Sequence, residues 1–246
     1  MILAVELIPA WRLAIAFVPV AGVLAVLWAW NQTIRTSVYA MLRMLIQLLI
    51  VGYVLLAIFQ TDQSLIVFAV LLVMATAASW ISLRTVPEQR KKLLGRALVS
   101  VGLAGGATLL LVTQGVLELT PWFSPRFLIP LGGMIFSSCM NSISLAAERI
   151  QSELTDGKPL NQARATAMHT ALIPITNTLF AVGLVSFPGM MTGQVLSGES
   201  PLVAARYQIM VMCMTFGASG LSTALFLWFS TRGGSPLLGN DVSTGE

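Results

Sequence analysis

Charged residues divide this chain into long uncharged runs. Seven runs are close to or above the ~20 apolar residues that a membrane-spanning helix needs. They cover Leu13–Ile34, Met44–Thr61, Gln63–Leu83, Ala97–Leu117, Phe127–Ala147, Ala165–Gly198 and Tyr207–Thr231. The pattern predicts an all-α integral membrane protein with about seven transmembrane helices, which form a single membrane domain over residues 1–231. The Gly-, Ser- and acid-containing residues 232–246 are predicted to be a disordered tail.

The sixth run is irregular because of its length. The 34 residues between Arg164 and Glu199 include no Asp, Glu, Lys or Arg. As one straight helix they would extend about 51 Å, which exceeds a hydrocarbon layer of ~30 Å but is too short for two crossings and a turn. Pro188 and Gly189 lie where the surplus begins, and both residue types favour a break in a helix. We therefore expect the sixth helix to be broken near Pro188-Gly189, where irregular backbone would be buried in protein or line a polar path.

Composition and the distribution of positive charge sharpen this topology. The chain is 56% hydrophobic and only 10% charged, whereas soluble domains carry about 25% charged residues. One side of the membrane receives Arg35, Arg43, Arg84, Arg90, Lys91, Lys92, Arg96, Arg149, Lys158, Arg164 and Arg232, and the other only Arg12, Arg126 and Arg206. Loops rich in Lys and Arg stay in the cytoplasm, so we expect the N-terminus outside and the C-terminus in the cytoplasm. The net charge of +4 fits loops that face anionic lipid and does not indicate nucleic-acid binding.

The beginning of the chain is interpreted as the first span. It has no basic segment ahead of the apolar run, and Trp-Ala-Trp-Asn is a poor cleavage site for a signal peptidase. We expect a multi-pass protein of the cell inner membrane, without a soluble domain before or after the membrane domain.

The longest cytoplasmic connector, Glu148–Arg164, has a helix–turn–helix pattern. Its first part extends the fifth helix into the cytoplasm. Asp156-Gly157-Lys158-Pro159 predicts a turn by its Gly and Pro, and a second, short helix is expected to begin near Leu160.

Motifs for two kinds of enzyme chemistry are incomplete. The Gly157-Lys158 pair is followed by Pro and lacks the upstream glycine of a Walker A loop, so the chain is not expected to bind ATP in that way. Phe216–Leu221 resembles the Gly-x-Ser-Gly nucleophile of rhomboid intramembrane proteases. The single histidine, His169, precedes Ser219, and no histidine follows that serine. Close helix packing explains the small residues better, and an intramembrane serine protease built on Ser219 is kept as an alternative of another class.

Polar and soft side chains within the spans are candidates for a translocation path. Gln47, Asn141 and Asn177 are amides at membrane depth that either hydrogen-bond between helices or line a polar path. Met190 and Met191 follow the expected break, and their thioethers either bind a soft metal such as Cu(I) or fill apolar space. A cargo gate is predicted at Pro188–Met191, and no set of metal ligands is assigned.

Several segments, in order along the chain, resemble those of a known family. They are Ile46–Leu55, Ile129–Met134 together with Asn141, Ala171–Pro174, Val182–Gly193 and Arg206–Val211. These segments are similar to the FetB family of ABC-transporter permeases, which includes bacterial iron exporters and plant aluminium-tolerance membrane subunits. The similarity runs from about Arg43 to Trp228, and the first forty residues carry no recognisable motif.

The resemblance implies a permease subunit that exports metal (iron) and has no ATPase domain of its own. A separate ABC ATPase would bind ATP–Mg, in an assembly of two permeases and two ATPases, while this chain would be neither an enzyme nor the holder of a cofactor. The same resemblance places Glu148–Arg164 against the ATPase, with Glu148, Glu153, Gly157 and Arg164 as coupling residues. Glu153-Leu-Thr-Asp-Gly157 is a looser version of the Glu-Ala-Ala…Gly loop of ABC importers. A permease for another cargo, such as a nucleotide sugar, is the alternative within the family.

Overall fold

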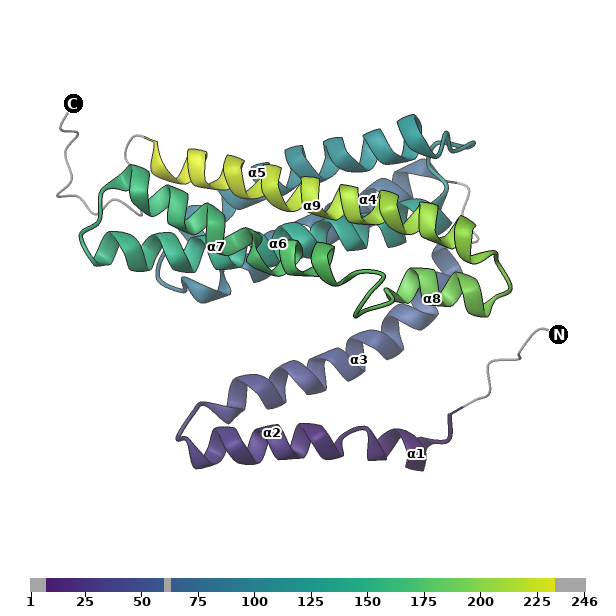
Figure 1. Cartoon of the computed structure of the whole chain (residues 1–246), viewed down its shortest axis with the longest axis horizontal. Coiled ribbons are helices and arrows are strands. Elements are labelled where there is room, and N and C mark those ends of the chain that lie inside the picture. The colour runs from purple at the N-terminus through teal and green to yellow at the C-terminus, as the bar shows by residue number, and fades with distance from the viewer. Residues whose placement is uncertain (1–7, 60–62, 233–246) are drawn as a thin grey trace. The chain divides into compact units, whose positions relative to one another are not determined.

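A computed structural model describes residues 8–59 and 63–232 of the chain (Figure 1). The described residues form two compact units, which divide at the gap between these ranges. Within both ranges the regular elements are helices, apart from an isolated bridge between Val182 and Ser186. The prediction of an all-α membrane protein is confirmed at this level.

The first unit contains α1 (Ala10–Ile15), α2 (Val18–Ala29) and α3 (Ile34–Ile58). The first uncharged run is therefore not one helix, because the chain turns at Asn31, whose φ of 53° is left-handed. Gln32 donates its N–H to the carbonyl of Leu27 at 2.9 Å across this turn, which is a common way to end a helix. Trp11–Ala29 and Ile34–Leu56 are long and apolar enough to cross a membrane, and the most apolar stretch of each has no buried residue.

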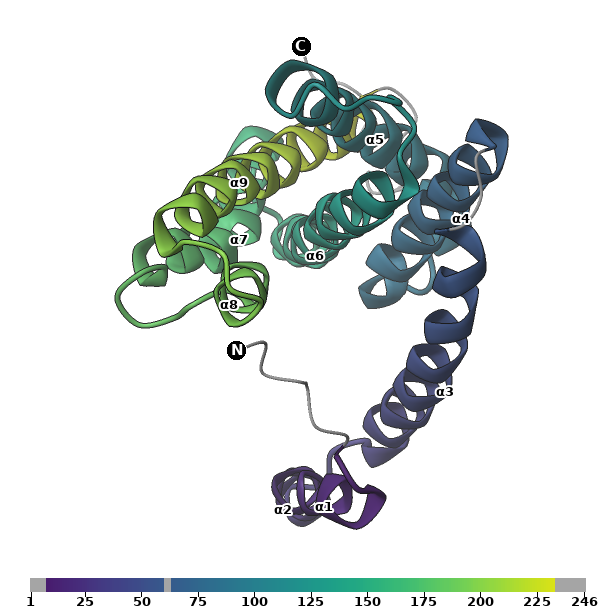
Figure 2. The ribbon, with the colours of Figure 1, turned by 90° about the vertical axis from the view of Figure 1, so that its right-hand side faces the viewer.

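The second unit is a bundle around one central helix. It contains α4 (Ser64–Ser82), the 3-10 turn η1 (Leu83–Thr85), α5 (Arg90–Leu110), the π-helical turn η2 (Leu111–Val116), α6 (Pro125–Thr155), α7 (Leu160–Ala181), α8 (Gly189–Leu196) and α9 (Pro201–Thr231). Helix α6 packs against α4, α5, α7 and α9 (Figure 2). Its buried face is formed by Ile135, Cys139, Ile143, Ala146 and Ile150, all without exposed surface. Their spacing of three or four residues keeps them on one side of the helix, so α6 supplies the core of the bundle.

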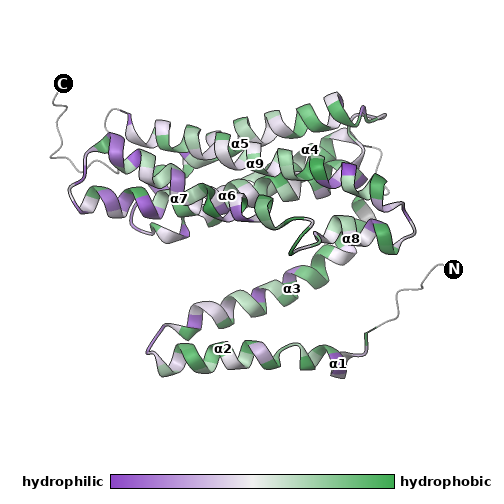
Figure 3. Ribbon diagram, viewed as in Figure 1, coloured by the Kyte–Doolittle hydropathy of each residue, from purple (hydrophilic) through white to green (hydrophobic). Residues whose placement is uncertain are grey.

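Six helical segments of the described chain are long and apolar enough to cross a membrane. They correspond to all of the predicted spans except the sixth, which is α7. The colouring in Figure 3 shows hydrophilic residues gathered where α6 and α7 join. Helix α7 carries Arg164, His169 and Asn177 within its 22 residues, and these polar side chains interrupt its apolar stretch.

The predicted break in the sixth run exists, and it covers the residues directly before Gly189. Helix α7 already ends at Ala181, and α8 begins at Gly189 with Pro188 directly before it. Between the helices, Gly183 adopts a φ of +81° and donates its N–H to the carbonyl of Ser186 at 3.0 Å. Glycine reaches this conformation without strain, whereas the missing N–H of a proline is harmless at a helix start. Pro188-Gly189 therefore starts the second helix and does not interrupt the first.

Candidate functional site

A polar cavity lies in the second unit, between α6, α7 and α9. Its volume is about 220 Å³. It is lined by Ser138, Asn141, Ser142, Leu145, Ala171, Pro174, Ile175, Thr178 and Ser219. The cavity thus contains one of the amides that the sequence assigned to a translocation path, together with the serine considered as a nucleophile.

The spacing of the α6 residues explains why they face the cavity together. Ser138, Asn141, Ser142 and Leu145 follow the i, i+3, i+4, i+7 pattern of a single helix face. This face lies beside the apolar one that forms the core, so α6 has one stripe for packing and one for polar groups. Ser219 of α9 contributes a further hydroxyl.

Helix α7 faces the same cavity with the same periodicity. Ala171, Pro174, Ile175 and Thr178 again follow the i, i+3, i+4, i+7 pattern. Pro174 lies inside the helix, and because proline has no N–H, the helical hydrogen bond to the preceding turn is missing there. The hydroxyl of Thr178 donates to the carbonyl of Pro174 at 2.9 Å. The wall of the cavity formed by α7 is therefore a point where this helix can bend.

Four polar side chains of the cavity make no hydrogen bond to another protein group in the described ranges. They are Ser138, Asn141, Ser142 and Ser219. Ser142 is only 4% exposed to solvent and Ser219 only 1%. Buried polar groups in proteins nearly always have a partner, so these two hydroxyls are available to a ligand, together with the half-buried Ser138 and the exposed Asn141.

Two further cavities lie at other levels of α9. One of about 190 Å³ is lined by Leu117, Arg126, Phe127, Pro130, Leu131, Met134, Met190, Tyr207 and Met210. Another of about 310 Å³ is lined by Arg164, Ala165, Met168, Ala224, Leu227 and Trp228. Nine residues separate Met210 from Ser219 and Ser219 from Trp228, or about 14 Å of helix in each case. Cavities therefore follow one another along α9.

The order of lining residues also gives the direction of the helices. The cavity that contains Met190 uses the early part of α6 and of α9, whereas the polar cavity uses the middle of both. Helices α6 and α9 therefore run parallel, and α7 runs in the opposite direction between them in the sequence.

Two of the residues predicted for the path line these cavities, and the others do not. Asn141 lines the polar cavity, and Met190 lines the cavity near α8, where it packs against the core beside Met134 and Met210. Asn177 is exposed on α7 and is not among the lining residues. Pro188, Gly189 and Met191 are likewise outside these linings, at the start of α8. Gln47 belongs to α3 of the first unit.

Sequence reasoning missed Ser138 and Ser142, although their spacing around Asn141 carried a signal. A Ser-Ser-x-x-Asn-Ser run in an apolar helix places three polar groups on one face.

The structure also bears on the alternative of a serine protease. Among the described residues that line the cavity around Ser219 there is no His, Asp, Glu or Lys, so a base that could activate this hydroxyl is missing from the lining.

The predicted helix–turn–helix between α6 and α7 is present, and its turn has the expected boundaries. Helix α6 ends at Thr155 and α7 begins at Leu160. Gly157 has a φ of +74°, and its N–H donates to Leu154 at 3.1 Å, while the N–H of Lys158 donates to Glu153 at 3.1 Å. This pair of bonds around a left-handed glycine is a Schellman ending. The second helix is not short, since α7 continues to Ala181. We call residues 148–164 the coupling hairpin.

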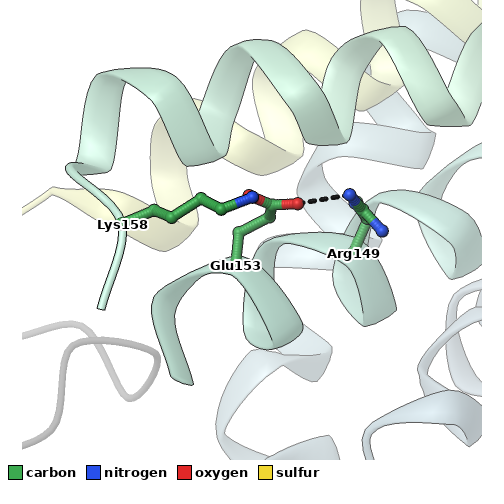
Figure 4. A network of polar contacts seen from close by, with 3 residues as sticks. All are labelled: Arg149, Glu153 and Lys158. Atoms are coloured by element: carbon green, nitrogen blue, oxygen red, sulfur yellow. Dashed lines mark ion pairs between the residues drawn. The ribbon is translucent and has the colours of Figure 1, made fainter. Parts of the chain in front are cut away.

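Glu153 holds the coupling hairpin together from inside. Its carboxylate forms ion pairs with Arg149, one turn earlier on α6, and with Lys158, whose Nζ lies 2.6 Å from Oε2 (Figure 4). The side chain is only 1% exposed, whereas those of Arg149 and Lys158 are about 40% exposed. Glu153 therefore has a structural role in the hairpin, whereas the acidic side chains of Glu148 and Asp156 are exposed.

Further polar contacts fasten the coupling hairpin to the bundle. Arg164 at the start of α7 donates from Nε to the hydroxyl of Thr231 at 2.6 Å, and its Nη2 contacts the same oxygen. Thr85 of η1 donates to the carbonyl of Ser144 at 3.1 Å. The start of α7 is thus joined to the end of α9, and η1 is joined to α6 at Ser144, shortly before the hairpin.

Candidate metal ligands are sparse in the structure. In the ranges described, no three His, Cys, Asp or Glu side chains are close enough to hold a metal ion together. Cys139 is buried, and its thiol donates to the carbonyl of Ala218 at 3.5 Å. Met134, Met190 and Met210 bring three thioethers to one cavity, which is also how methionine fills apolar space.

Comparison with known proteins identifies relatives along nearly the whole chain. The model of an uncharacterised protein family, UPF0014, matches residues 10–233. A UPF0014 membrane protein of Synechocystis sp. is 36% identical over 212 residues, which cover 80% of this chain and 78% of that protein. The probable iron export permease protein FetB of Escherichia coli is 33% identical over 210 residues, with coverage of 77% and 78%.

A plant relative extends this range. Protein ALUMINUM SENSITIVE 3 of Arabidopsis thaliana is 28% identical over 225 residues, which cover 83% of this chain and 80% of that protein. No solved structure matches the chain. The family match begins at residue 10, earlier than Arg43, where the resemblance in the sequence begins, so that α1, α2 and α3 lie within the matched region.

Proposed function

This chain belongs to the UPF0014 family of membrane proteins, and we propose on that premise that it is the membrane-spanning permease subunit of an ABC transporter that exports iron. A separate ATPase subunit would bind ATP–Mg and supply the energy, with two copies of each subunit in the inner membrane. The chain is a multi-pass membrane protein, and the probable iron export permease FetB of Escherichia coli is among its relatives.

The observation that carries this proposal is the polar cavity between α6, α7 and α9. Burying a hydroxyl or amide without a partner costs free energy, and the cost is highest where lipid surrounds the protein. A bundle that only anchored a partner would gain stability from apolar residues at Ser142 and Ser219, both buried and without a protein partner. Their presence supports a ligand that passes through this level of the bundle.

The directions of the helices support seven spans. Helices α6 and α9 run parallel and are both long and apolar enough to cross the membrane. The chain must return between them, and the 22 residues of α7 extend about 33 Å, whereas the eight of α8 extend about 12 Å. In the proposal α7 is therefore the sixth crossing despite its polar residues, with the N-terminus outside and the C-terminus in the cytoplasm.

The coupling hairpin supports the use of an external ATPase. Its outer surface includes Glu148, Asp156 and Lys158, while the ion pairs of Glu153 hold it together and Arg164 binds it to α9. ATP binding and hydrolysis in the partner would displace the hairpin as one body. Because the hairpin continues into α6 and α7, this movement would change the cavity between them, with Pro174 as the bending point.

The size of the cavity favours a small cargo. About 220 Å³ is less than the roughly 300–1,000 Å³ of most pockets for drug-sized ligands. This supports a metal ion over a nucleotide sugar, the alternative cargo in the same family.

The test is co-purification of the chain with a candidate ABC ATPase subunit from the same organism, followed by reconstitution in vesicles. We expect ATP-dependent iron transport that is lost when the Walker A lysine of the ATPase is replaced. Transport that persists without ATP, or a chain that binds no ATPase, would contradict the proposal. Stimulation of ATP hydrolysis by a nucleotide sugar and not by iron would show that the chain is an ABC permease whose cargo is the sugar.

A further inference from the structure

The ligands that the polar cavity offers are all uncharged. They are the hydroxyls of Ser138, Ser142, Thr178 and Ser219 and the amide of Asn141. Protein sites that hold bare iron use carboxylates, imidazoles or thiolates, and none of the lining residues has such a group. The nearest thiol, that of Cys139, is buried and engaged with the carbonyl of Ala218.

The positions of the acidic residues also argue against a bare iron ion in the cavity. In the described part of the second unit, the acidic residues lie at helix ends or in connections, at Glu88, Glu118, Glu148, Glu153, Asp156 and Glu199. None is at the level of Asn141 and Ser219. A dehydrated divalent or trivalent ion in this cavity would therefore be a buried charge without a counter-charge, which is strongly unfavourable.

Hydroxyl and amide groups suit hydrogen bonding better than metal binding, because each can both donate and accept a hydrogen bond. They suit a ligand whose surface carries oxygen atoms, such as the carboxylate and hydroxyl groups of a small chelator or coordinated water. The four side chains without a protein partner come from two helices and surround one cavity, so several such bonds can form to one ligand.

We infer that the polar cavity receives its metal cargo inside an oxygen-ligand shell that the cargo brings with it, and that the protein contacts this shell by hydrogen bonds and not the metal itself. The inference rests on the proposed export of iron and adds the chemical form of the cargo. The chelator supplies negative charge directly to the ion, which the lining residues do not. Water and a small hydroxycarboxylate present the same oxygen chemistry, and the experiment separates them.

The experiment measures binding of radioactive iron to the purified full-length chain in detergent, which requires no ATPase. The probes are ferric citrate, and ferrous ion kept reduced without a chelator. We expect ferric citrate to bind and to lose roughly two- to tenfold in affinity in Ser142→Ala and in Ser219→Ala, the range for one hydrogen bond. Ser137→Ala is the matched control, because Ser137 neighbours the lining residue Ser138 but donates to its own helix at Met134.

A further variant is designed to bind the bare ion. Asn141→Asp places a carboxylate in the cavity, and it should strengthen the binding of unchelated ferrous ion while it weakens that of anionic ferric citrate. If only unchelated ferrous ion binds to the unchanged protein, and Ser142→Ala weakens it, the shell is water and a chelator is not required. Binding of either form that is unaffected by both serine variants would overturn the inference while the proposed function stands. If neither form binds, iron as the cargo fails together with the inference.

Discussion

Polar side chains have protein partners in the coupling hairpin and lack them in the polar cavity, although α6 and α7 contribute to both. In the hairpin, the buried carboxylate of Glu153 has two cationic partners, and the turn satisfies the last carbonyls of α6. In the cavity, buried hydroxyls such as those of Ser142 and Ser219 have no protein partner. The difference indicates that the charges of the hairpin maintain its structure, whereas the uncharged polar groups that line the cavity are left for a ligand.

The largest effect is expected when the charge is removed from the hairpin. Glu153→Gln keeps the shape of the side chain but leaves Arg149 and Lys158 without their carboxylate, and the substituted group stays buried. We expect a clear fall in the thermal unfolding temperature and in the yield of folded protein in detergent. Glu148→Gln, five residues earlier on α6 and exposed, is the control and should leave both unchanged. Equal behaviour of the two variants would mean that the ion pairs contribute nothing to the fold.

A smaller effect is expected at the turn itself. Gly157→Ala forces a side chain into the left-handed region at φ +74°, which costs about 1–2 kcal/mol and should lower the unfolding temperature by roughly 2–8 °C. Gly157→Asn should be milder, because asparagine tolerates this conformation. Gly189→Ala serves as the comparison, since this glycine has an ordinary φ and open space around it. If both alanine variants unfold at the same temperature, the hairpin does not depend on its glycine.

The smallest effect on stability is expected in the cavity. Combined Ser142→Ala and Ser219→Ala substitution removes no protein hydrogen bond, so the free energy of unfolding should change by no more than about 0.5 kcal/mol. Iron transport in vesicles should nevertheless fall, because the ligand loses its partners. A variant that unfolds as readily as Glu153→Gln would show that these hydroxyls are structural, and the contrast between the two regions would disappear.

Local signals predicted the hairpin well, because the chain around Gly157 determines its own conformation. Glycine and proline mark the turn, and the bonds that close it join residues within five positions of one another. The ion pair from Glu153 to Lys158 was not predicted, since burial of the carboxylate depends on helices that pack against it. The same dependence explains why its structural role was not foreseen: the motif match suggested coupling, and the structure adds ion pairs that hold the hairpin together.

The cavity and the helix break were predicted less completely. Asn141 was chosen because amides are conspicuous in apolar spans, but serines in helices often bond to their own backbone, as Ser79 does to Ala75. Only tertiary structure shows that Ser142 lacks such a bond. For the break, attention to Pro188 missed that proline is compatible with a helix start, while the left-handed Gly183 marks the turn.

The length of α6 determines where a partner can meet this protein. Its 31 residues extend about 46 Å, which is some 16 Å more than the hydrocarbon layer is thick. In the proposed orientation most of this excess projects on the cytoplasmic side, beyond the lipid headgroups. Helix α9 has the same length, and the bond from Arg164 to Thr231 supports the projecting part from the side. A soluble subunit could therefore bind the tip of the hairpin without touching the membrane surface.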